Sequence, residues 1–277
     1  MEKRAYIVMW VSAHLLKVAN RPGRQFWEID CLRGIAIVMM ITFHLLFDLT
    51  YFAGYNFNLN SGFWLIFARL TATIFIFLVG LSLTLSYSRA TSEKKEGLCI
   101  KFSQRGLRIF GWGLAITLFT WLFLREGFIV FGILHLIGIS IILAYPFLRV
   151  RRKFLLVLLG IFCLSAGLYL RNFTFDFYWL LWLGFRPQHF YTLDYFPILP
   201  WFGVVLIGIF VGDLLYPNHT RRFEIGEPGS KLNLLFIQPF SFLGRHSLII
   251  YLAHQPVLVA SLCLVLNPQL LLQFFKL

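Results

Sequence analysis

The sequence has little charge. Only 13% of its 277 residues are Asp, Glu, Lys or Arg, whereas a soluble globular domain carries about 25%. With 59% of the residues hydrophobic, there is too little polar surface to cover an exterior that faces water. The composition therefore excludes an ordinary soluble domain.

Metal-type motifs, internal repeats and soluble domains are also missing. The four cysteines show neither metal-ligand spacing nor the spacing of a secreted disulfide framework, and we interpret them as ordinary thiols. A net charge of +13 would suit a nucleic-acid binder, but the charges follow the loops between apolar runs. We therefore expect no metal cofactor and no nucleic-acid partner.

Long apolar runs fill most of the chain instead. Several approach or exceed the roughly 18–20 residues needed to cross a bilayer, which is far too long for β-barrel strands. We expect an all-α, polytopic membrane helix bundle. Its transmembrane helices are expected at about residues 30–52, 62–86, 106–124, 128–148, 154–170, 195–216 and 242–266.

Basic residues predict the orientation of these helices. Most of the 25 Lys and Arg residues fall in alternate loops, and the loops on the other side hold only Arg125, Arg171, Arg186 and Lys276. Because cytoplasmic loops are enriched in positive charge, the N-terminus is expected in the cytoplasm and the C-terminus outside.

A shorter apolar run at residues 5–16 lies between basic flanks. Its length favours an interfacial helix within a cytoplasmic segment, residues 1–25, ahead of a single membrane domain, residues 26–277. If the run spans the bilayer, the helices number eight, and a cleaved signal segment is also left open.

The first long run carries four ionisable residues on one helical face. At 100° per residue, Asp30, Arg33, His44 and Asp48 fall within an arc of about 60° and extend over roughly 27 Å of the helix axis. Charges are costly in lipid, so this stripe should face the bundle interior. Asp30 and Arg33 are also compatible with a helix-start charge and a side chain that reaches the interface.

His44 and Asp48 lie one helical turn apart. A carboxylate at this spacing can fix the tautomer of the imidazole and stabilise its charged form, as in a general base, a nucleophile or a proton relay. Arg69, His135 and His254 are expected at a similar depth on other helices. They are equally compatible with structural roles: Arg69 could neutralise Asp48, and the two histidines could be satisfied buried imidazoles.

Five segments carry a family resemblance. EIDCLRGIAIVMMITFHLLFDLTYF (28–52) resembles the opening helix of the heparan-α-glucosaminide N-acetyltransferase catalytic-domain family, especially its prokaryotic members. The other segments follow in the expected order: IFIFLVGLSLTLSYSR (74–89), FGILHLIGIS (131–140), DYFPILPWFGVVLIGIFVG (194–212) and LGRHSLIIYLAHQPVL (243–258).

The resemblance implies a transmembrane acyltransferase in the plasma membrane of a prokaryote. Such an enzyme would take an acyl group, with acetyl favoured, from cytoplasmic acyl-CoA and deliver it to an amine or hydroxyl of an extracytoplasmic acceptor such as a sugar. FHLLFDL is not the eukaryotic sequence, so neither the heparan substrate nor the eukaryotic catalytic histidine is carried over.

The resemblance and the positions of the ionisable residues together suggest catalytic and binding roles for particular residues. His44 is expected to act as general base or as acyl-accepting nucleophile, oriented by Asp48. Binding of substrate or oxyanion is assigned to Arg69, His135 and His254, and binding of acyl-CoA, the co-substrate, to Asp30, Arg33, Arg105 and Arg108.

Two other functional classes remain open. His44, Asp48 and Arg69 could serve a proton-coupled transporter, although the chain lacks the repeated halves common in such carriers. A structural or assembly protein would leave the His–Asp pair unexplained. The sequence leaves open the acceptor, N- against O-acylation, the acyl chain length and the oligomeric state.

Overall fold

A computed structural model gives the structure of residues 26–94, 96–124, 126–224 and 232–266. Throughout these ranges the chain is all-α, with loops and two isolated bridges but no strand. Five helices are long and apolar enough to cross a membrane, and two shorter apolar helices accompany them. The prediction of a polytopic helix bundle is confirmed, whereas residues 1–25, including the expected interfacial helix, lie outside the described residues.

The helices follow the predicted order along the chain. Their bounds are α2 (Trp27–Ala53), α3 (Gly62–Ser92), α4 (Leu98–Leu124), α5 (Ile133–Leu148), α6 (Phe154–Leu170), η1 (Leu181–Leu183), α7 (Ile198–Leu215), η2 (Pro217–His219), η3 (Asn233–Ile237), α9 (Gln238–Arg245) and α10 (Ser247–Leu266).

Some boundaries differ from the prediction. Helix α4 begins at Leu98, because a basic, polar turn continues the helix beyond the apolar run. Helix α5 begins only at Ile133, where Gly132 is its extended N-cap residue. The last predicted helix is two helices, because the chain leaves helical geometry at His246.

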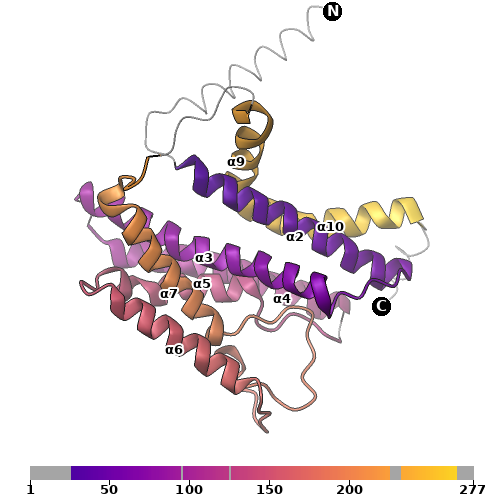
Figure 1. Ribbon diagram of the computed structural model, residues 1–277. Coiled ribbons are helices and arrows are strands. Elements are labelled where there is room, and N and C mark those ends of the chain that lie inside the picture. Colours follow the sequence, from indigo (N-terminus) through magenta and orange to yellow (C-terminus); the bar gives the residue numbers. More distant parts are fainter. Residues whose placement is uncertain (1–25, 95, 125, 225–231, 267–277) are drawn as a thin grey trace, which may run out of the picture.

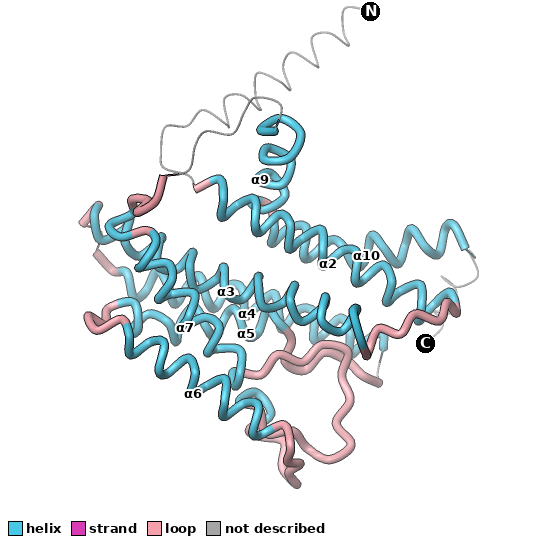
Figure 2. Tube along the Cα trace, in the orientation of Figure 1, coloured by secondary structure: helices cyan, strands magenta, loops and turns pink. Residues whose placement is uncertain are grey.

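Helices α2, α9 and α10 form one side of the bundle, and α3 to α7 form the other (Figures 1 and 2). Helix α2 contacts α3, α9 and α10, so it joins the two sides. Helix α7 packs against both α3 and α6, and α5 packs against α4 and α7. The main apolar core lies among α3, α5 and α7, with contributions from α4 and α6.

Glycines allow these helices to approach closely. A methyl group on Gly80 of α3 would overlap the carbonyl oxygen of Val205 in α7, and one on Gly208 would overlap Phe77. Close packing of this kind is typical of small residues in membrane helices. The same holds for the other crossings, at Gly34 and Gly244 (α2 with α9), Gly106 and Gly138 (α4 with α5), and Gly160 and Gly203 (α6 with α7).

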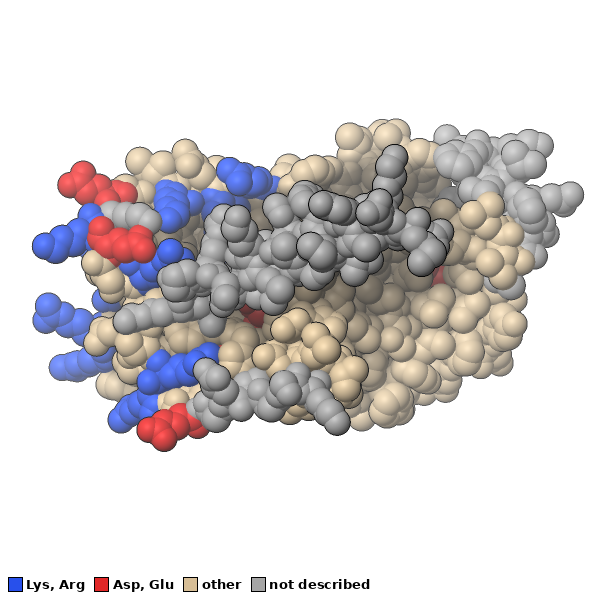
Figure 3. All heavy atoms as spheres, turned by 90° about the horizontal axis from the view of Figure 1, so that it is seen from above, with Lys and Arg blue, Asp and Glu red and all other residues tan. Residues whose placement is uncertain are grey.

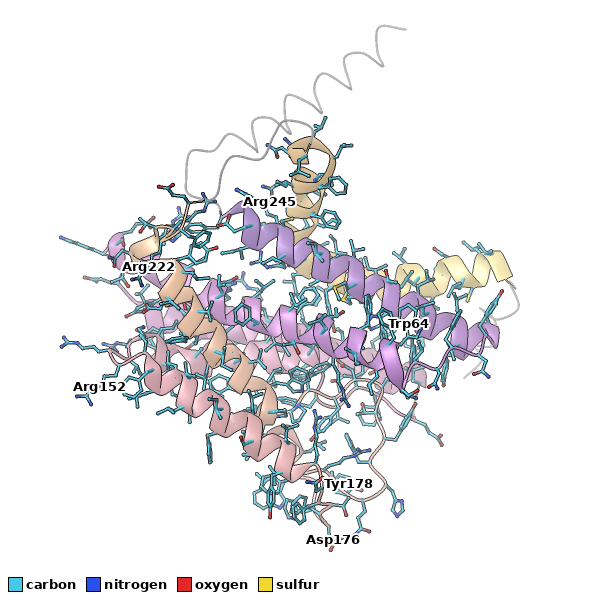
Figure 4. The ribbon with its side chains drawn as sticks, viewed as in Figure 1. Trp64, Arg152, Asp176, Tyr178, Arg222 and Arg245 are labelled. Carbon is cyan, nitrogen blue, oxygen red and sulfur yellow. The ribbon has the colours of Figure 1, made fainter. Side chains whose placement is uncertain are left out.

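The two ends of the bundle differ chemically. Lys and Arg gather at one end, here called the basic end (Figure 3), where the ends of α3 and α7 and the start of α6 lie. Arg152 and Arg222 lie there, while Trp64 and Tyr178 lie away from it (Figure 4). The opposite, aromatic end includes an aromatic loop, residues 171–194, with exposed Tyr178, Trp179 and Trp182. This polarity matches the distribution of basic loops expected from the sequence.

Replacing Gly80 with Ala tests the crossing of α3 and α7. The added methyl group must displace the backbone of α7, so we expect a loss of about 1–3 kcal/mol and a clearly lower midpoint of thermal denaturation in detergent. Gly111→Ala is the matched control, because a methyl group there meets nothing within 4 Å. Equal midpoints for Gly80→Ala and the wild type would contradict this packing.

Candidate functional site

The polar stripe of α2 has two parts, and the first is centred on Arg33. Its guanidinium donates to Asp30 Oδ1 at 3.0 Å, to Ser82 Oγ of α3 at 2.8 Å and to the carbonyl oxygen of Gly244 in α9 at 3.4 Å. The charge of Arg33 is therefore shared among three helices. Arg33 is therefore a half-buried attachment point between helices and not a side chain that simply reaches the interface.

Two more guanidinium groups lie around Arg33. The charge of Arg33 acts on Arg105 of α4, and Arg245 of α9, beside the start of α2 (Figure 4), acts together with Arg33 on Asp30. No described residue forms an ion pair with Arg105 or Arg245. Arg33, Arg105 and Arg245, hereafter the arginine cluster, thus carry more positive charge than Asp30 balances, because Glu28, which also acts on Asp30, is paired with Arg221.

A cavity lies one helical turn from the arginine cluster. Ser86 lines it, four residues after the Ser82 that binds Arg33, so both serines share one face of α3. Its volume is about 270 Å³, and its other lining residues are Arg89, Ala90, Glu93 and Lys101. The cavity and the cluster together make this end of the bundle a candidate site for an anion.

The second part of the stripe brings two imidazoles together. The rings of His44 in α2 and His254 in α10 lie edge to face, with centroids 4.8 Å apart. The Nδ1 atom of His44 lies 2.9 Å from the carbonyl oxygen of Met40, and that of His254 lies 2.6 Å from the carbonyl oxygen of Tyr251. Since a carbonyl only accepts, both rings carry their proton on Nδ1 in the neutral state, which leaves each Nε2 as a basic nitrogen.

Asp48 is fully buried one turn from His44, but its recorded partner is on another helix. Its Oδ1 accepts from the side-chain amide of Gln255 in α10 at 2.6 Å. The direct contact with His44 that the spacing predicts is replaced by this bond, because the Nδ1 of His44 turns back to Met40. Asp48 therefore contacts α10 through a hydrogen bond, whereas His44 contacts it through its ring, which lies against that of His254.

Arg69 and His135 do not join this pair of histidines. Arg69 is exposed on α3. It lies near Arg171 at the end of α6, and the pKa of Arg171 is lowered mainly by desolvation and to a smaller extent by the charge of Arg69. Asp48 is bound by Gln255 and not by Arg69. Of the four helices predicted to converge, the structure brings together α2 and α10.

His135 has a structural environment. Its Nδ1 accepts from the backbone N–H of Gly132 at 3.2 Å, and its Nε2 lies 3.3 Å from the hydroxyl of Thr117. Its ring packs between Phe110 and Phe131 and is 2% exposed. Both ring nitrogens therefore hold the start of α5 against α4. This environment agrees with the alternative that His135 is a buried imidazole with a structural role.

Arg105 and Arg108 are both exposed on α4, with no hydrogen bond or ion pair among the described residues, but only Arg105 interacts with the charge of Arg33, so only Arg105 of this pair belongs to the arginine cluster. Three residues of interest were missed in the sequence: Gln255, Arg245 and Asp194. Gln255 and Arg245 lie within the segment LGRHSLIIYLAHQPVL, and Asp194 is the first residue of DYFPILPWFG. Both segments carry the family resemblance, so the sequence already marked these regions as candidates for functional residues.

Asp194 closes the aromatic end of the bundle. Its Oδ2 accepts from the backbone N–H of Ile133, the first residue of α5, at 3.0 Å. Carboxylates at this position are stabilised by the helix dipole. Burial nevertheless raises the pKa of Asp194 to about 6, although the bond from Ile133 acts in the opposite direction.

No group of three His, Cys, Asp or Glu side chains that could hold a metal ion occurs in the described ranges. A comparison with known families matches residues 25–256 to the family described as "Heparan-alpha-glucosaminide N-acetyltransferase, catalytic". Neither the curated proteins nor the solved structures contain a match.

The raised pKa of Asp194 predicts how stability depends on pH. The folded state binds a proton more tightly than the unfolded chain, whose Asp has a pKa near 3.8, so the cost of burying the charge is present above pH 6 and is lost as the pH falls toward 4. Asp194→Asn keeps an acceptor for Ile133 but cannot ionise. In the wild type we expect the free energy of unfolding to rise by at most about 3 kcal/mol as the pH falls from 7.5 to 4.5. In Asp194→Asn we expect this rise to be absent.

Thermal denaturation midpoints across this pH range measure the effect. Asp176→Asn is the control, because Asp176 lies exposed in the aromatic loop and bonds Gln188. The assignment fails if wild type and Asp194→Asn have parallel pH profiles.

Proposed function

Because the chain belongs to the heparan-α-glucosaminide N-acetyltransferase catalytic-domain family, we propose that it moves an acetyl group from acetyl-CoA to an acceptor on the other side of a membrane. Family membership supports a membrane acetyltransferase in general. The observation that carries the finer proposal is the layout of α2, which has a guanidinium cluster near one end and a basic imidazole pair further along.

The basic end is the donor side. Basic loops favour a cytoplasmic location, in a prokaryote the inner face of the plasma membrane, and acyl-CoA is a cytoplasmic metabolite. The arginine cluster has guanidinium groups to spare for the phosphates of CoA, and guanidinium forks suit phosphate oxygens. From Arg33 to His44 the helix axis rises roughly 16 Å, so an extended thioester arm along α2 would point toward the imidazoles.

His44 acts as the general base in this proposal. Its Nε2 takes a proton from the acceptor amine or hydroxyl as the acceptor nitrogen or oxygen attacks the thioester carbonyl. The new bond to the acetyl carbon forms while the carbon–sulfur bond breaks, and the CoA thiolate receives the proton from the imidazolium. The Nδ1 hydrogen bond to Met40 holds the ring in the tautomer that this step requires.

A two-step route uses the same residues. His44 Nε2 would first accept the acetyl group and release CoA, and the acceptor would then attack the acetyl-imidazole. His254, whose unprotonated Nε2 lies on a ring beside His44, would serve as base in that second step. In this tautomer the Nε2 of His254 has no proton to donate to an oxyanion, and its Nδ1 proton is bound to Tyr251, so we assign His254 proton transfer and not the oxyanion role expected from the sequence.

His44→Ala tests the base. We expect acetyl transfer to fall by about 10²-fold or more, whereas binding of acetyl-CoA and the denaturation midpoint change little. CoA release in the presence of a panel of amino sugars, measured with a thiol reagent, gives turnover, and calorimetry gives binding. Rapid labelling of wild type but not His44→Ala by acetyl-CoA would select the two-step route.

His246→Ala is the matched control for this experiment. His246 makes the same kind of bond, with Nδ1 2.9 Å from the carbonyl oxygen of Phe242, but it is exposed at the end of α9. A His44→Ala protein with full turnover would rule out His44 as base or nucleophile.

Arg105→Gln tests the donor site. Loss of one charged contact to phosphate should weaken acetyl-CoA binding about tenfold or more and reduce its dependence on salt. Binding of acetyl-pantetheine, which lacks the adenine nucleotide, should be unchanged. Arg152→Gln, at the exposed tip of the basic end (Figure 4), is the control, and equal losses in both variants would indicate only a general effect of charge.

A further inference from the structure

Three buried polar atoms beside His44 have no hydrogen-bond partner among the described residues. They are Oδ2 of Asp48, Oε1 of Gln255 and Nε2 of His254. Asp48 is 0% exposed and His254 is 9% exposed, so water outside the bundle does not readily reach them. Buried polar atoms are usually paired because leaving one unpaired costs about 1–3 kcal/mol.

The three atoms are alike in a way that restricts what can bind them. Asp48 as a carboxylate has only acceptor oxygens. Gln255 must present its NH₂ group to Asp48, so the atom left over is its carbonyl oxygen. His254 donates through Nδ1 to the carbonyl of Tyr251, so its Nε2 also accepts. The group therefore consists of acceptors only.

Each of these orientations depends on a bond that the structure records. The 2.6 Å bond from Gln255 fixes one oxygen of Asp48 and thereby leaves the other free. Since Gln255 and His254 are neighbours on α10 and Asp48 lies on α2, this bond also ties the two helices at the level of the histidine pair. Without the amide, the carboxylate would be free to rotate toward other partners.

We infer that Gln255 is a positioning residue that fixes Asp48, so that Asp48 Oδ2, Gln255 Oε1 and His254 Nε2 form the subsite for the reactive end of the acceptor substrate. The inference rests on the proposed function. A subsite of acceptors with one negative charge suits the amine that an N-acetyltransferase acylates, because such an amine is a positively charged primary ammonium with several N–H hydrogens before it reacts. Neighbouring His44 then lies where a proton of that ammonium must be removed before the nitrogen can attack.

Two substitutions of Gln255 separate positioning from packing. Gln255→Leu removes both polar atoms, whereas Gln255→Glu keeps the shape but places a second carboxylate against Asp48. In Gln255→Glu a proton shared between the two carboxylates restores the bond as the pH falls. Gln188→Leu is the control, because the amide of Gln188 makes the same kind of bond, 3.1 Å to Asp176, in the exposed aromatic loop.

The experiment measures CoA release by the full-length protein, with acetyl-CoA as donor and glucosamine as the amine probe. We expect Gln255→Leu to raise the KM for glucosamine at least tenfold and to leave the Kd for acetyl-CoA unchanged. Gln188→Leu should match the wild type in both. Gln255→Glu should resemble Gln255→Leu at pH 8 and recover relative to it toward pH 6. His44, His254 and Tyr251 are titratable groups close to residue 255, and the ratio of the two variants removes the part of their titration that both variants share.

Several results would overturn the inference. Wild-type KM and turnover in both Gln255 variants, with only the denaturation midpoint lowered, would make the bond purely structural. A constant ratio between the two variants from pH 8 to pH 6 would also contradict it. Acetyl-CoA binding by the wild type without any glucosamine-dependent CoA release would remove the ammonium subsite but leave the donor site standing. Absence of acetyl-CoA binding would instead reject the proposed function itself.

Discussion

Helix α2 must satisfy its polar side chains with partners from other helices, and much of the arrangement around it follows from this. Lipid offers no hydrogen bonds, so the half-buried Arg33 and the fully buried Asp48 have to meet donors or acceptors from the protein. Arg33 does so through Ser82 of α3 and the backbone of α9, and Asp48 does so through Gln255 of α10. These contacts fix the rotation of α2 about its axis and bring α9 and α10 to it.

Glycines make these polar contacts possible. A methyl group on Gly34 or Gly244 would overlap the facing backbone, so α2 and α9 approach closely only because both positions lack a side chain. The Gly244 carbonyl then lies within reach of Arg33. Close packing and charge satisfaction therefore depend on each other at this crossing, and the arginine cluster is built on it.

The histidines show why buried polar groups need to be judged by their partners. His135 and His254 look alike in the sequence, as single imidazoles within apolar helices. In the structure His135 has both nitrogens engaged between Gly132 and Thr117, which gives it a role at the start of α5. The Nε2 of His254 has no hydrogen-bond partner in the part of the chain that the structure describes, and it lies beside His44, which is typical of a functional site.

The sequence by itself determined the seven apolar helices, the polar face of α2, the unequal distribution of basic loops and the family. Apolar length, helical periodicity and loop charge are local properties, so they can be read along the chain. Only the tertiary structure decided that Asp48 binds Gln255 and not His44 or Arg69, that Arg245 joins Arg33 and Arg105, and that Asp194 closes α5. Those choices depend on how neighbouring helices rotate and slide against one another, and no local pattern specifies that, because every exposed face of a membrane helix is equally apolar to the lipid.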